Sequence, residues 1–393
     1  MAGEYNRQVI HRAFRYRLYP TPEQAEAFDR AAGVVRFVYN LAWEQRHTWG
    51  RRHRINFASQ CRELTVLREQ VDWIAAVSCT AHTQALRDLD RAFTNFFKGR
   101  KHYPTPRRRG ENDSFRFKGS EVHRKRQSDR WSVALLPRIG WVKFRDTRPM
   151  AGRCLNVTVK RGALGWFASF TCEIEHEAIP TSLPAVGIDR GVANTLALST
   201  GELLSLPDLS TIDRQHKRAQ RVLARRKKGS KRRLRQLRRC ARLSAKRARI
   251  RRDWHHKTST TIARRFGHVA LEDLNVQGMT AKGRGKRGLN RVILNQGWGA
   301  FEVLLAYKLE ERGGTLDKVP AAYTSLTCSE CGTVDKQSRE SQSVFACQSC
   351  GHTMHADTNA AINIRRRSTA LQRAEASGYG AVETRTTHAA LAA

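Results

Sequence analysis

Acidic residues are scarce in this sequence. The chain of 393 residues has 35 Asp and Glu against 72 Lys and Arg, which gives a formal net charge of +37. This imbalance excludes an evenly mixed charged surface, and repulsion among so many cations opposes compaction unless a polyanion balances them. We therefore expect a polyanionic partner, and an excess of this size favours nucleic acid over a membrane surface.

Long apolar runs are also lacking. No stretch reaches the roughly 18 residues that a membrane-spanning helix needs, and the N-terminal MAGEYNRQVIHRAFRYRLYP lacks the apolar core of a secretory signal. We expect an intracellular, cytoplasmic protein with no membrane partner. In that reducing compartment the nine cysteines do not form a disulfide framework.

Two C-x-x-C pairs stand 15 residues apart in CSECGTVDKQSRESQSVFACQSCG. This spacing is typical of a zinc ribbon, with a redox pair or free thiols as the alternative. The expected zinc ligands are Cys328, Cys331, Cys347 and Cys350. Four thiolates leave no open coordination position, so the zinc would be structural. His352 and His355 are not expected to be ligands, and the other five cysteines fit small buried positions.

The N-terminal half alternates between strand and helix patterns. Residues 9–19 alternate bulky and basic side chains, which predicts a strand, and Thr21 then caps a helix with Pro22 in its first turn. A second helix is expected near residues 80–97, and β patterns fill residues 129–176, with a hairpin around GALG. Together they predict a small β-barrel and a helical block inserted into it or beside it.

A basic link covers residues 98–118. Its aromatic residues Tyr103, Phe115 and Phe117 alternate with Lys and Arg, a pattern suited to stacking on nucleic-acid bases. A solvated loop beside a strand is the alternative. The candidate nucleic-acid contacts in this link are Tyr103, Arg107 and Arg108.

The most charged segment is 213–257. Between Arg214 and Lys257 it has 21 Lys or Arg and one acid, Asp253. A Gly-Ser turn inside RRKKGSKRR predicts two antiparallel helices, and an apolar stripe that starts at Leu234 and Leu237 predicts that they pack. The basic face would contact a phosphate backbone, although a merely solvated face is the alternative. The candidate contacts are Arg225, Arg226, Lys227, Lys228, Lys231, Arg232, Arg233, Arg238 and Arg239.

Acidic residues of three segments occupy positions where an acid needs an explanation. Asp189 ends the apolar strand 185–188, Glu272 and Asp273 follow the apolar strand 269–271, and Asp357 precedes a helix. Asp189 alone could pair with the neighbouring arginine or cap a turn. Acids from three segments of such a basic chain instead favour a site for hard cations such as Mg²⁺, which take oxygen ligands and can act in pairs on a phosphodiester.

Four segments in this order, GIDRGVANTLALS, LEDLNVQGM, TSLTCSECG and DTNAAINI, resemble the RuvC motifs and the interrupted zinc ribbon of the TnpB family. That family consists of transposon-associated RNA-guided DNA endonucleases related to type V CRISPR effectors. The opening FRYRLYPTPEQ and RFVYNLAWEQR is also similar to the family's N-terminal signature. The resemblance covers nearly the whole chain. It implies that Asp189, Glu272 and Asp357 are the catalytic, Mg²⁺-binding triad and that Asp273 is a structural neighbour.

The resemblance also implies a multidomain α/β fold with a β-barrel. The N-terminal lobe would be a β-barrel wedge domain with an inserted helical recognition domain, and the C-terminal lobe an RNase-H-like RuvC domain with an inserted zinc ribbon. The implied ranges are 1–20 and 112–180 for the wedge, 21–111 for the recognition domain, 181–323 and 352–367 for RuvC, 324–351 for the ribbon, and 368–393 for a disordered tail. Two departures stand out: Arg190 replaces a usually apolar residue, and His355 and Ala356 replace residues that are often polar or acidic.

The implied activity is Mg²⁺-dependent hydrolysis of target DNA, with two metal ions, structural Zn²⁺ and a guide RNA as cofactors. The partners would be the guide RNA and double-stranded target DNA with a short flanking motif read by the protein, in the cytoplasm of a prokaryotic cell and on its nucleoid when bound to DNA. The oligomeric state stays open. The alternatives are a compact type V CRISPR effector, a guided DNA-binding protein that does not cut, and a transposase that acts without RNA.

Overall fold

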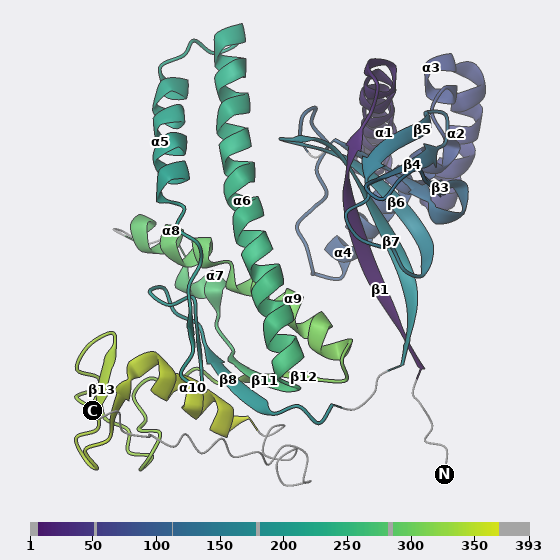
Figure 1. Ribbon diagram of the computed structural model, residues 1–393. Coiled ribbons are helices and arrows are strands. Elements are labelled where there is room, and N and C mark those ends of the chain that lie inside the picture. The colour runs from purple at the N-terminus through teal and green to yellow at the C-terminus, as the bar shows by residue number, and fades with distance from the viewer. Residues whose placement is uncertain (1–6, 51–52, 112, 178–180, 282–285, 369–393) are drawn as a thin grey trace, which may run out of the picture. The chain divides into compact units, whose positions relative to one another are not determined.

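The computed structural model describes residues 7–50, 53–111, 113–177, 181–281 and 286–368. The described chain forms two compact units that divide between His176 and Glu177. Both units combine α-helices with β-sheet (Figure 1). The predicted mixed α/β class is therefore confirmed, and each unit is described by itself below. No described helix is both long enough and apolar enough to cross a membrane.

The first unit is built on a seven-stranded sheet with the order β2-β6-β7-β1-β5-β4-β3. Its strands are β1 (Arg7–Tyr19), β2 (Ser114–Lys118), β3 (His123–Arg126), β4 (Trp131–Leu136), β5 (Gly140–Arg145), β6 (Arg153–Gly162) and β7 (Gly165–Glu177). The predicted strand at residues 9–19 and the predicted hairpin are confirmed, because β6 and β7 pair in antiparallel fashion down to Gly162 and Gly165.

The predicted closed barrel is wrong, since the sheet is open. Within the described residues, no ladder joins its edge strands β2 and β3. All four residues of β3, the sequence HRKR, are exposed. Closure would have to bring this basic edge strand over an apolar interior, whereas charged side chains normally keep a sheet edge in water.

Four helices follow β1 in the first unit: α1 (Pro22–Trp49), α2 (Phe57–Gln70), α3 (Asp72–Ala75) and α4 (Cys79–Phe97). The predicted cap of α1 is confirmed, because the Thr21 hydroxyl accepts a hydrogen bond from the Gln24 amide and the Gln24 side chain accepts one from the Thr21 amide. The short 3₁₀ turn η1 (Gly119–Glu121) links β2 to β3.

The aromatic residues of β2 do not serve base stacking. Phe115 and Phe117 are 2% and 1% exposed, and Phe115 packs near Phe28 of α1 at a ring-centroid distance of 5.8 Å. Alternation along a strand sends both rings to the same face, and in β2 that face is the core. The prediction that these two rings stack on bases is therefore wrong.

The second unit contains a five-stranded sheet with the order β10-β9-β8-β11-β12. Its strands are β8 (Ala185–Asp189), β9 (Leu196–Leu198), β10 (Leu203–Leu204), β11 (His268–Glu272) and β12 (Thr315–Val319). Strands β8, β11 and β12 are parallel, and β9 returns antiparallel to β8. The unit's helices are α5 (Ser210–Ala224), α6 (Lys231–Arg265), α7 (Val276–Met279), α8 (Arg287–Gln296), α9 (Trp298–Glu310) and α10 (Ala356–Arg367).

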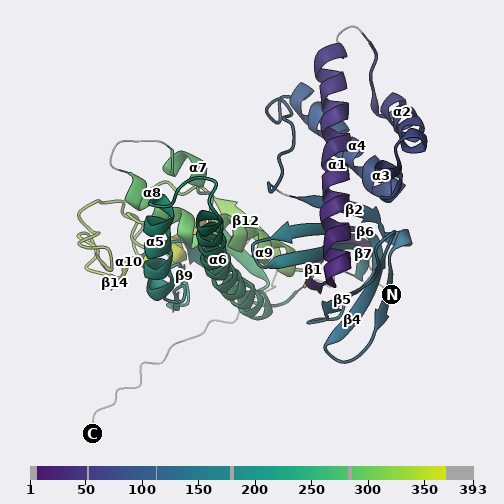
Figure 2. The same cartoon turned by 90° about the horizontal axis from the view of Figure 1, so that it is seen from above.

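Helices α5 and α6 form the predicted antiparallel pair and lie side by side in both views (Figures 1 and 2). The apolar stripe predicted to join them is wrong, because Leu234 and Leu237 are 48% and 43% exposed. Other apolar residues of the two helices are buried, among them Ala219 of α5 and Cys240 of α6, and a polar contact also joins the helices: Gln236 Nε2 donates to the Ala219 carbonyl at 2.8 Å.

Candidate acidic site and cysteine cluster

Alternation along β8 decides where Asp189 points. Val186 and Ile188 belong to the apolar core that α6 and α9 build on one face of the sheet. Because successive side chains of a strand point to opposite faces, Gly187 and Asp189 lie on the other face. Helix α10 covers that face (Figure 1).

Strand β11 repeats the pattern. Val269 and Leu271 enter the same core as β8, while Ala270 packs with Ile364 of α10. Glu272, two residues after Ala270, therefore lies on the α10 face as well. Since β8 and β11 are parallel neighbours with Ile188 opposite Leu271, Asp189 and Glu272 emerge together at the carboxyl ends of adjacent strands.

Helix α10 brings the third acid to the same place. A Cβ atom at Gly187 would lie 2.1 Å from the Ala361 carbonyl oxygen, so only glycine lets the helix approach β8 this closely. Asp357 is in the first turn of α10, and its amide donates to Nδ1 of His355, the residue that caps the helix, at 3.2 Å. The structure thus brings together the three carboxylates that the sequence singled out.

Polar side chains hold two of the three acids. Asn194 Nδ2 donates to Asp357 Oδ2 at 3.0 Å, in the turn after β8. The Thr324 hydroxyl donates to Glu272 Oε1 at 2.5 Å, and Thr324 is 2% exposed. Asp273, by contrast, faces solvent with a side chain that is 67% exposed.

Burial and mutual repulsion perturb the acids. Burial, followed by the charges of Glu272 and Asp357, raises the pKa of Asp189 to about 7. Burial also raises the pKa of Glu272, while its hydrogen bond from Thr324 and the charge of Arg190 partly offset that effect. Carboxylates crowded in this way are costly until a cation neutralises them.

One cation already reaches the acids. Arg339 Nη2 lies 3.6 Å from Asp357 Oδ1, and its charge lowers the pKa values of both Asp189 and Glu272. Arg339 belongs to the segment between the two C-x-x-C pairs. No spacing or motif distinguishes Arg339 from the other polar residues of that segment, so it was not predicted. Thr324 opens the motif TSLTCSECG, but the motif alone does not show that its hydroxyl contacts Glu272.

The alternative in which the Asp189 carboxylate pairs with the guanidinium of its neighbour is wrong. Arg190 does not pair with it, because its guanidinium is directed to Glu302 of α9 at 3.1 Å and to the backbone carbonyl of Glu272. The side chains of Asp189 and Arg190 therefore lie on opposite faces of the sheet.

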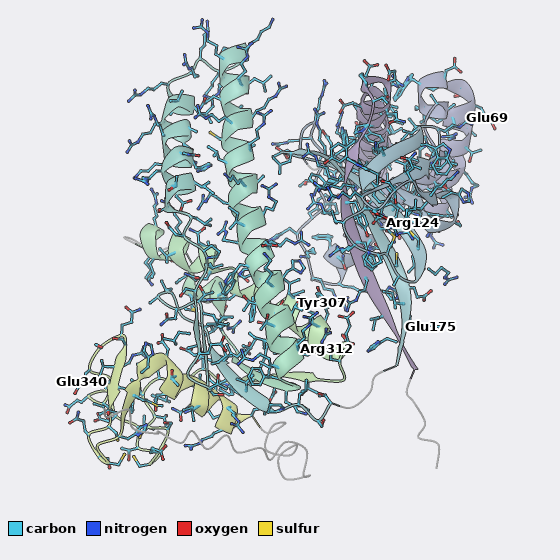
Figure 3. The ribbon with its side chains drawn as sticks, viewed as in Figure 1. Glu69, Arg124, Glu175, Tyr307, Arg312 and Glu340 are labelled. Carbon is cyan, nitrogen blue, oxygen red and sulfur yellow. The ribbon has the colours of Figure 1, made fainter. Side chains whose placement is uncertain are left out.

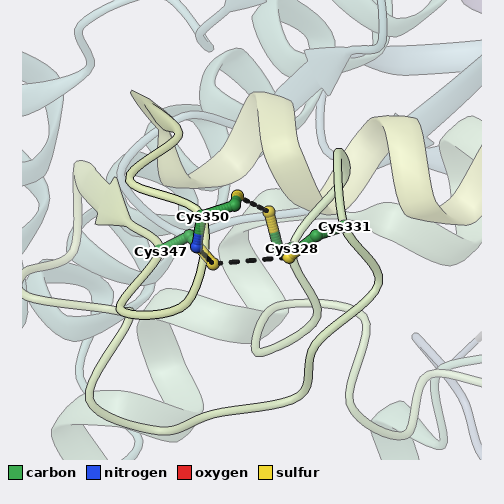
Figure 4. Close-up of side chains that lie close together, drawn as sticks. All are labelled: Cys328, Cys331, Cys347 and Cys350. Atoms are coloured by element: carbon green, nitrogen blue, oxygen red, sulfur yellow. Dashed lines mark hydrogen bonds between the residues drawn. The ribbon is translucent and has the colours of Figure 1, made fainter.

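The four predicted zinc ligands converge as well (Figure 4). Their Sγ atoms all lie within 4.8 Å of one another, and among the described residues this is the one group of three or more Asp, Glu, His or Cys side chains at that spacing. Two of the distances are 3.7 Å, between Cys328 and Cys350, and 3.6 Å, between Cys331 and Cys347. A tetrahedral zinc site with Zn–S bonds of about 2.3 Å needs sulfurs about 3.8 Å apart, so the cluster fits the ion.

Local structure supports this cluster. Backbone amides of Glu330 and Cys350 donate to the Cys328 and Cys347 sulfurs at 3.4 and 3.5 Å. Strands β13 (Val344–Ala346) and β14 (Thr353–His355) pair beside it. His352 and His355 are not members of the cluster.

Most of the predicted nucleic-acid contacts on the α5–α6 hairpin are exposed, and nitrogen-tipped side chains project along both helices (Figure 3). The exposed ones are Arg225, Arg226, Lys227, Lys228, Lys231, Arg232, Arg238 and Arg239. Arg233 differs, because its Nη1 donates to the Leu223 carbonyl at 2.8 Å and so ties the end of α5 to α6.

The contacts predicted in the link of the first unit are divided. Arg108 is exposed. Tyr103 is partly exposed, and its hydroxyl is hydrogen-bonded to His47 Nδ1 at 3.1 Å. Arg107 pairs with Asp88 at 3.1 Å, so its guanidinium has a partner inside the protein. A role of these residues in nucleic-acid binding stays a prediction.

Comparison with known proteins adds family matches. Residues 169–282 match a family described as "Probable transposase" and residues 298–364 one described as "Cas12f1-like, TNB domain". Residues 10–54 match a "Helix-turn-helix domain", although here they form mainly β1 and the single long helix α1.

Relatives match over most of their length. The "Putative RNA-guided DNA endonuclease InsQ" of Escherichia coli K12 is 36% identical over 372 residues, 90% of this chain and 91% of the relative. A "Putative RNA-guided DNA endonuclease" of Streptomyces pristinaespiralis is 34% identical over 369 residues, 91% of this chain and 89% of the relative. The solved "Cas12f1-sgRNA-target DNA complex" shares the fold with a TM-score of 0.54 at 16% identity, over 88% of this chain and 83% of that chain.

Proposed function

Because this chain belongs to the TnpB family, whose relatives above are named RNA-guided DNA endonucleases, we propose that it is a guide-RNA-dependent nuclease that cuts target DNA at the acidic site of its second unit. The observation that carries the proposal is the convergence of Asp189, Glu272 and Asp357 on one face of the sheet. In a chain with a net charge of +37, three carboxylates gathered together, two of them buried and one half-buried, favour a functional site.

The donor set fits Mg²⁺. Carboxylate oxygens are the ligands that this hard cation prefers. The raised pKa values of Asp189 and Glu272 mean that their ionised forms are unfavourable on their own, and a bound cation would stabilise those forms. Bound metal ions would activate water and stabilise charge on the phosphodiester oxygens. The carboxylates are not gathered as tightly as the cysteine sulfurs, and a wider cluster suits two ions that share ligands.

The protein's own residues supply positioning. Thr324 fixes the Glu272 carboxylate, and Asn194 fixes that of Asp357. Arg339, from the segment between the two C-x-x-C pairs, contacts the acid cluster. Its guanidinium could also donate hydrogen bonds to a phosphate oxygen. Its presence lowers the repulsion among the acids before any metal or DNA arrives.

The rest of the chain would hold nucleic acid. The exposed cations of the α5–α6 hairpin suit a phosphate backbone, which binds without regard to sequence. Sequence readout would then come from guide pairing, with a short flanking duplex motif read by the protein. We assign residues 181–323 and 352–367 to a RuvC-like nuclease domain, 324–351 to the ribbon, and the first unit to the wedge and recognition domains.

The experiment begins with sequencing the RNA that copurifies with the protein. A target DNA matched to that RNA is then tested for Mg²⁺-dependent cleavage and, separately, for binding. Asp189→Ala should abolish cleavage by orders of magnitude and leave binding intact, because the metals act mainly in the transition state whereas contacts elsewhere supply affinity.

Asp273→Ala is the matched control, because Asp273 adjoins Glu272 but is exposed. It should retain most of the cleavage. Full cleavage by Asp189→Ala would overturn the proposed active site. Absence of any copurifying RNA, with cleavage intact, would overturn the guided mechanism.

A further inference from the structure

Arg190 is the residue beside the acids whose role the proposed function does not use. Alternation along β8 and its continuation puts its side chain on the α9 face, opposite Asp189. It is 5% exposed. Its Nη1 lies 3.1 Å from Glu302 Oε2 on α9, and its Nη2 donates to the backbone carbonyl of Glu272 at the end of β11. One side chain thus joins the end of β8, the end of β11 and a covering helix.

Keeping a guanidinium there is energetically expensive. A buried cation costs several kcal/mol of desolvation unless it is well paired, and replacing such a pair with apolar side chains is often neutral or stabilising. Arg190 is only partly satisfied, because its Nε has no hydrogen-bond partner among the described atoms. Glu302 would remain paired without it, since Lys318 Nζ lies 2.6 Å from Glu302 Oε1. Stability alone therefore does not explain the residue.

The position of the contact explains it better. The backbone ladder between β8 and β11 ends at Ile188 and Leu271, one residue before each acid. Beyond that point β11 is still paired with β12, through Glu272 and Val319, but not with β8. The hydrogen bond from Arg190 to the Glu272 carbonyl therefore connects the two acid-bearing strand ends beyond the last paired residues of β8 and β11.

We propose that Arg190 is a positioning residue that locks the strand ends of Asp189 and Glu272 at a fixed separation, with Glu302 as the anchor of its guanidinium. The inference rests on the proposed function, because it concerns how well the acids are placed for divalent cations. The planar fork of arginine directs separate nitrogens at the carbonyl and at the carboxylate. The three donors of a lysine all leave one nitrogen and cannot reproduce that geometry, and a leucine fills space but donates nothing.

The test compares Arg190→Leu, Arg190→Lys and wild type. The first measurement is the Mg²⁺ concentration that gives half-maximal cleavage, and the second is the affinity for Mn²⁺ measured by calorimetry without nucleic acid. Loss of a residue that orients a metal ligand typically weakens metal affinity 10–100-fold. Arg190→Leu should therefore raise the half-maximal Mg²⁺ concentration and the Mn²⁺ dissociation constant by about tenfold or more, and Arg190→Lys should recover part of the loss.

Lys308→Met is the matched control for a purely structural effect. Lys308 is a second buried cation, located on α9 and 7% exposed, and its Nζ donates to Ser259, Thr260 and the His256 carbonyl on α6. This variant should lower the melting temperature without moving the half-saturating Mg²⁺ concentration. If Arg190→Leu does not fold, Glu302→Gln is measured with Arg190→Lys, and each should shift the metal dependence in the same direction by a smaller factor.

The outcomes separate the two proposals. Metal dependence within twofold of wild type in every folded variant, while Asp189→Ala abolishes cleavage, would overturn the role of Arg190 and leave the nuclease site standing. Retained cleavage by Asp189→Ala would overturn the nuclease site itself. Equal shifts in Arg190→Leu and Lys308→Met would show that Arg190 acts only through general stability, which also overturns the proposal.

Discussion

Asp189→Asn is expected to make the metal-free protein more stable at the same time as it removes the proposed nuclease activity. The pKa of Asp189 is raised from its usual 3.8 to about 7, first by burial and then by the charges of Glu272 and Asp357. A raised carboxyl pKa means that the folded state holds a proton which the unfolded state has released. Stability therefore falls as the pH rises from about 4 to about 7, and the full cost is present above that window.

The magnitude follows from the same values. At about 1.4 kcal/mol for each pKa unit, the rise to about 7 corresponds to roughly 4 kcal/mol at pH 8. Asparagine keeps the shape and cannot ionise, so Asp189→Asn should recover up to roughly that amount. At pH 5 the wild-type folded state is already protonated at this site, and the linkage relation leaves a gain of only about 1.5 kcal/mol.

The assay is thermal unfolding by calorimetry at pH 5 and pH 8, in buffers without added divalent ions and without a chelator that would remove zinc. For a unit of roughly 150–250 residues, 1 kcal/mol corresponds to about 2–4 °C, so the rise at pH 8 should be as large as roughly 8–16 °C. Added Mg²⁺ should stabilise the wild type more than the variant, because only the wild type has the full repulsion to neutralise.

Asp273→Asn provides the control, since this exposed neighbour should change the melting temperature little at either pH. A melting temperature of Asp189→Asn that is unchanged or lower at pH 8 would refute the reasoning. So would a gain of equal size at pH 5 and pH 8, because that gain could not come from ionisation of the carboxyl.

Three further outcomes are expected. Gly187→Val should destabilise the second unit by at least about 2 kcal/mol and impair cleavage, because the valine Cβ would lie 2.1 Å from the Ala361 carbonyl oxygen and push α10 away. A melting temperature equal to that of wild type would contradict the close approach. Cys328→Ser should release zinc, measured by elemental analysis, and lower the melting temperature, since the free energy of metal binding at such a site contributes to the stability of the fold. Wild-type protein without zinc would exclude the zinc ribbon. Replacing the exposed Arg232, Arg238 and Arg239 with Glu should weaken RNA binding. The slope of log affinity against log salt should fall by roughly 0.7–0.9 for each phosphate that the variant no longer neutralises. An unchanged slope would rule out the basic face of the α5–α6 hairpin as the binding surface.

Local sequence could predict the elements that depend on neighbouring residues. The cap of α1 needs only Thr21 and Gln24, which are three residues apart, and the hairpin of β6 and β7 needs only a tight turn. The errors arose where burial depends on distant residues. Phe115 and Phe117 alternate with cations in the sequence. The helix that packs against β2 decides which of its faces is buried and which is exposed to solvent. The closure of the first sheet likewise depends on whether its two edges meet.

The sequence by itself determined the chemistry of this protein: an excess of cations for a polyanion, two cysteine pairs at the spacing of a zinc ribbon, and acids at the ends of apolar strands. These features are readable because metal ligands and charge depend on residue type and local spacing. Only the tertiary structure decided how the acids are held. The contacts of Glu272 with Arg190 and Thr324, and of Asp357 with Arg339, join residues that are far apart along the chain. Such contacts form only after strand alternation has chosen a face and helices have covered it, so no pattern in the linear sequence records them.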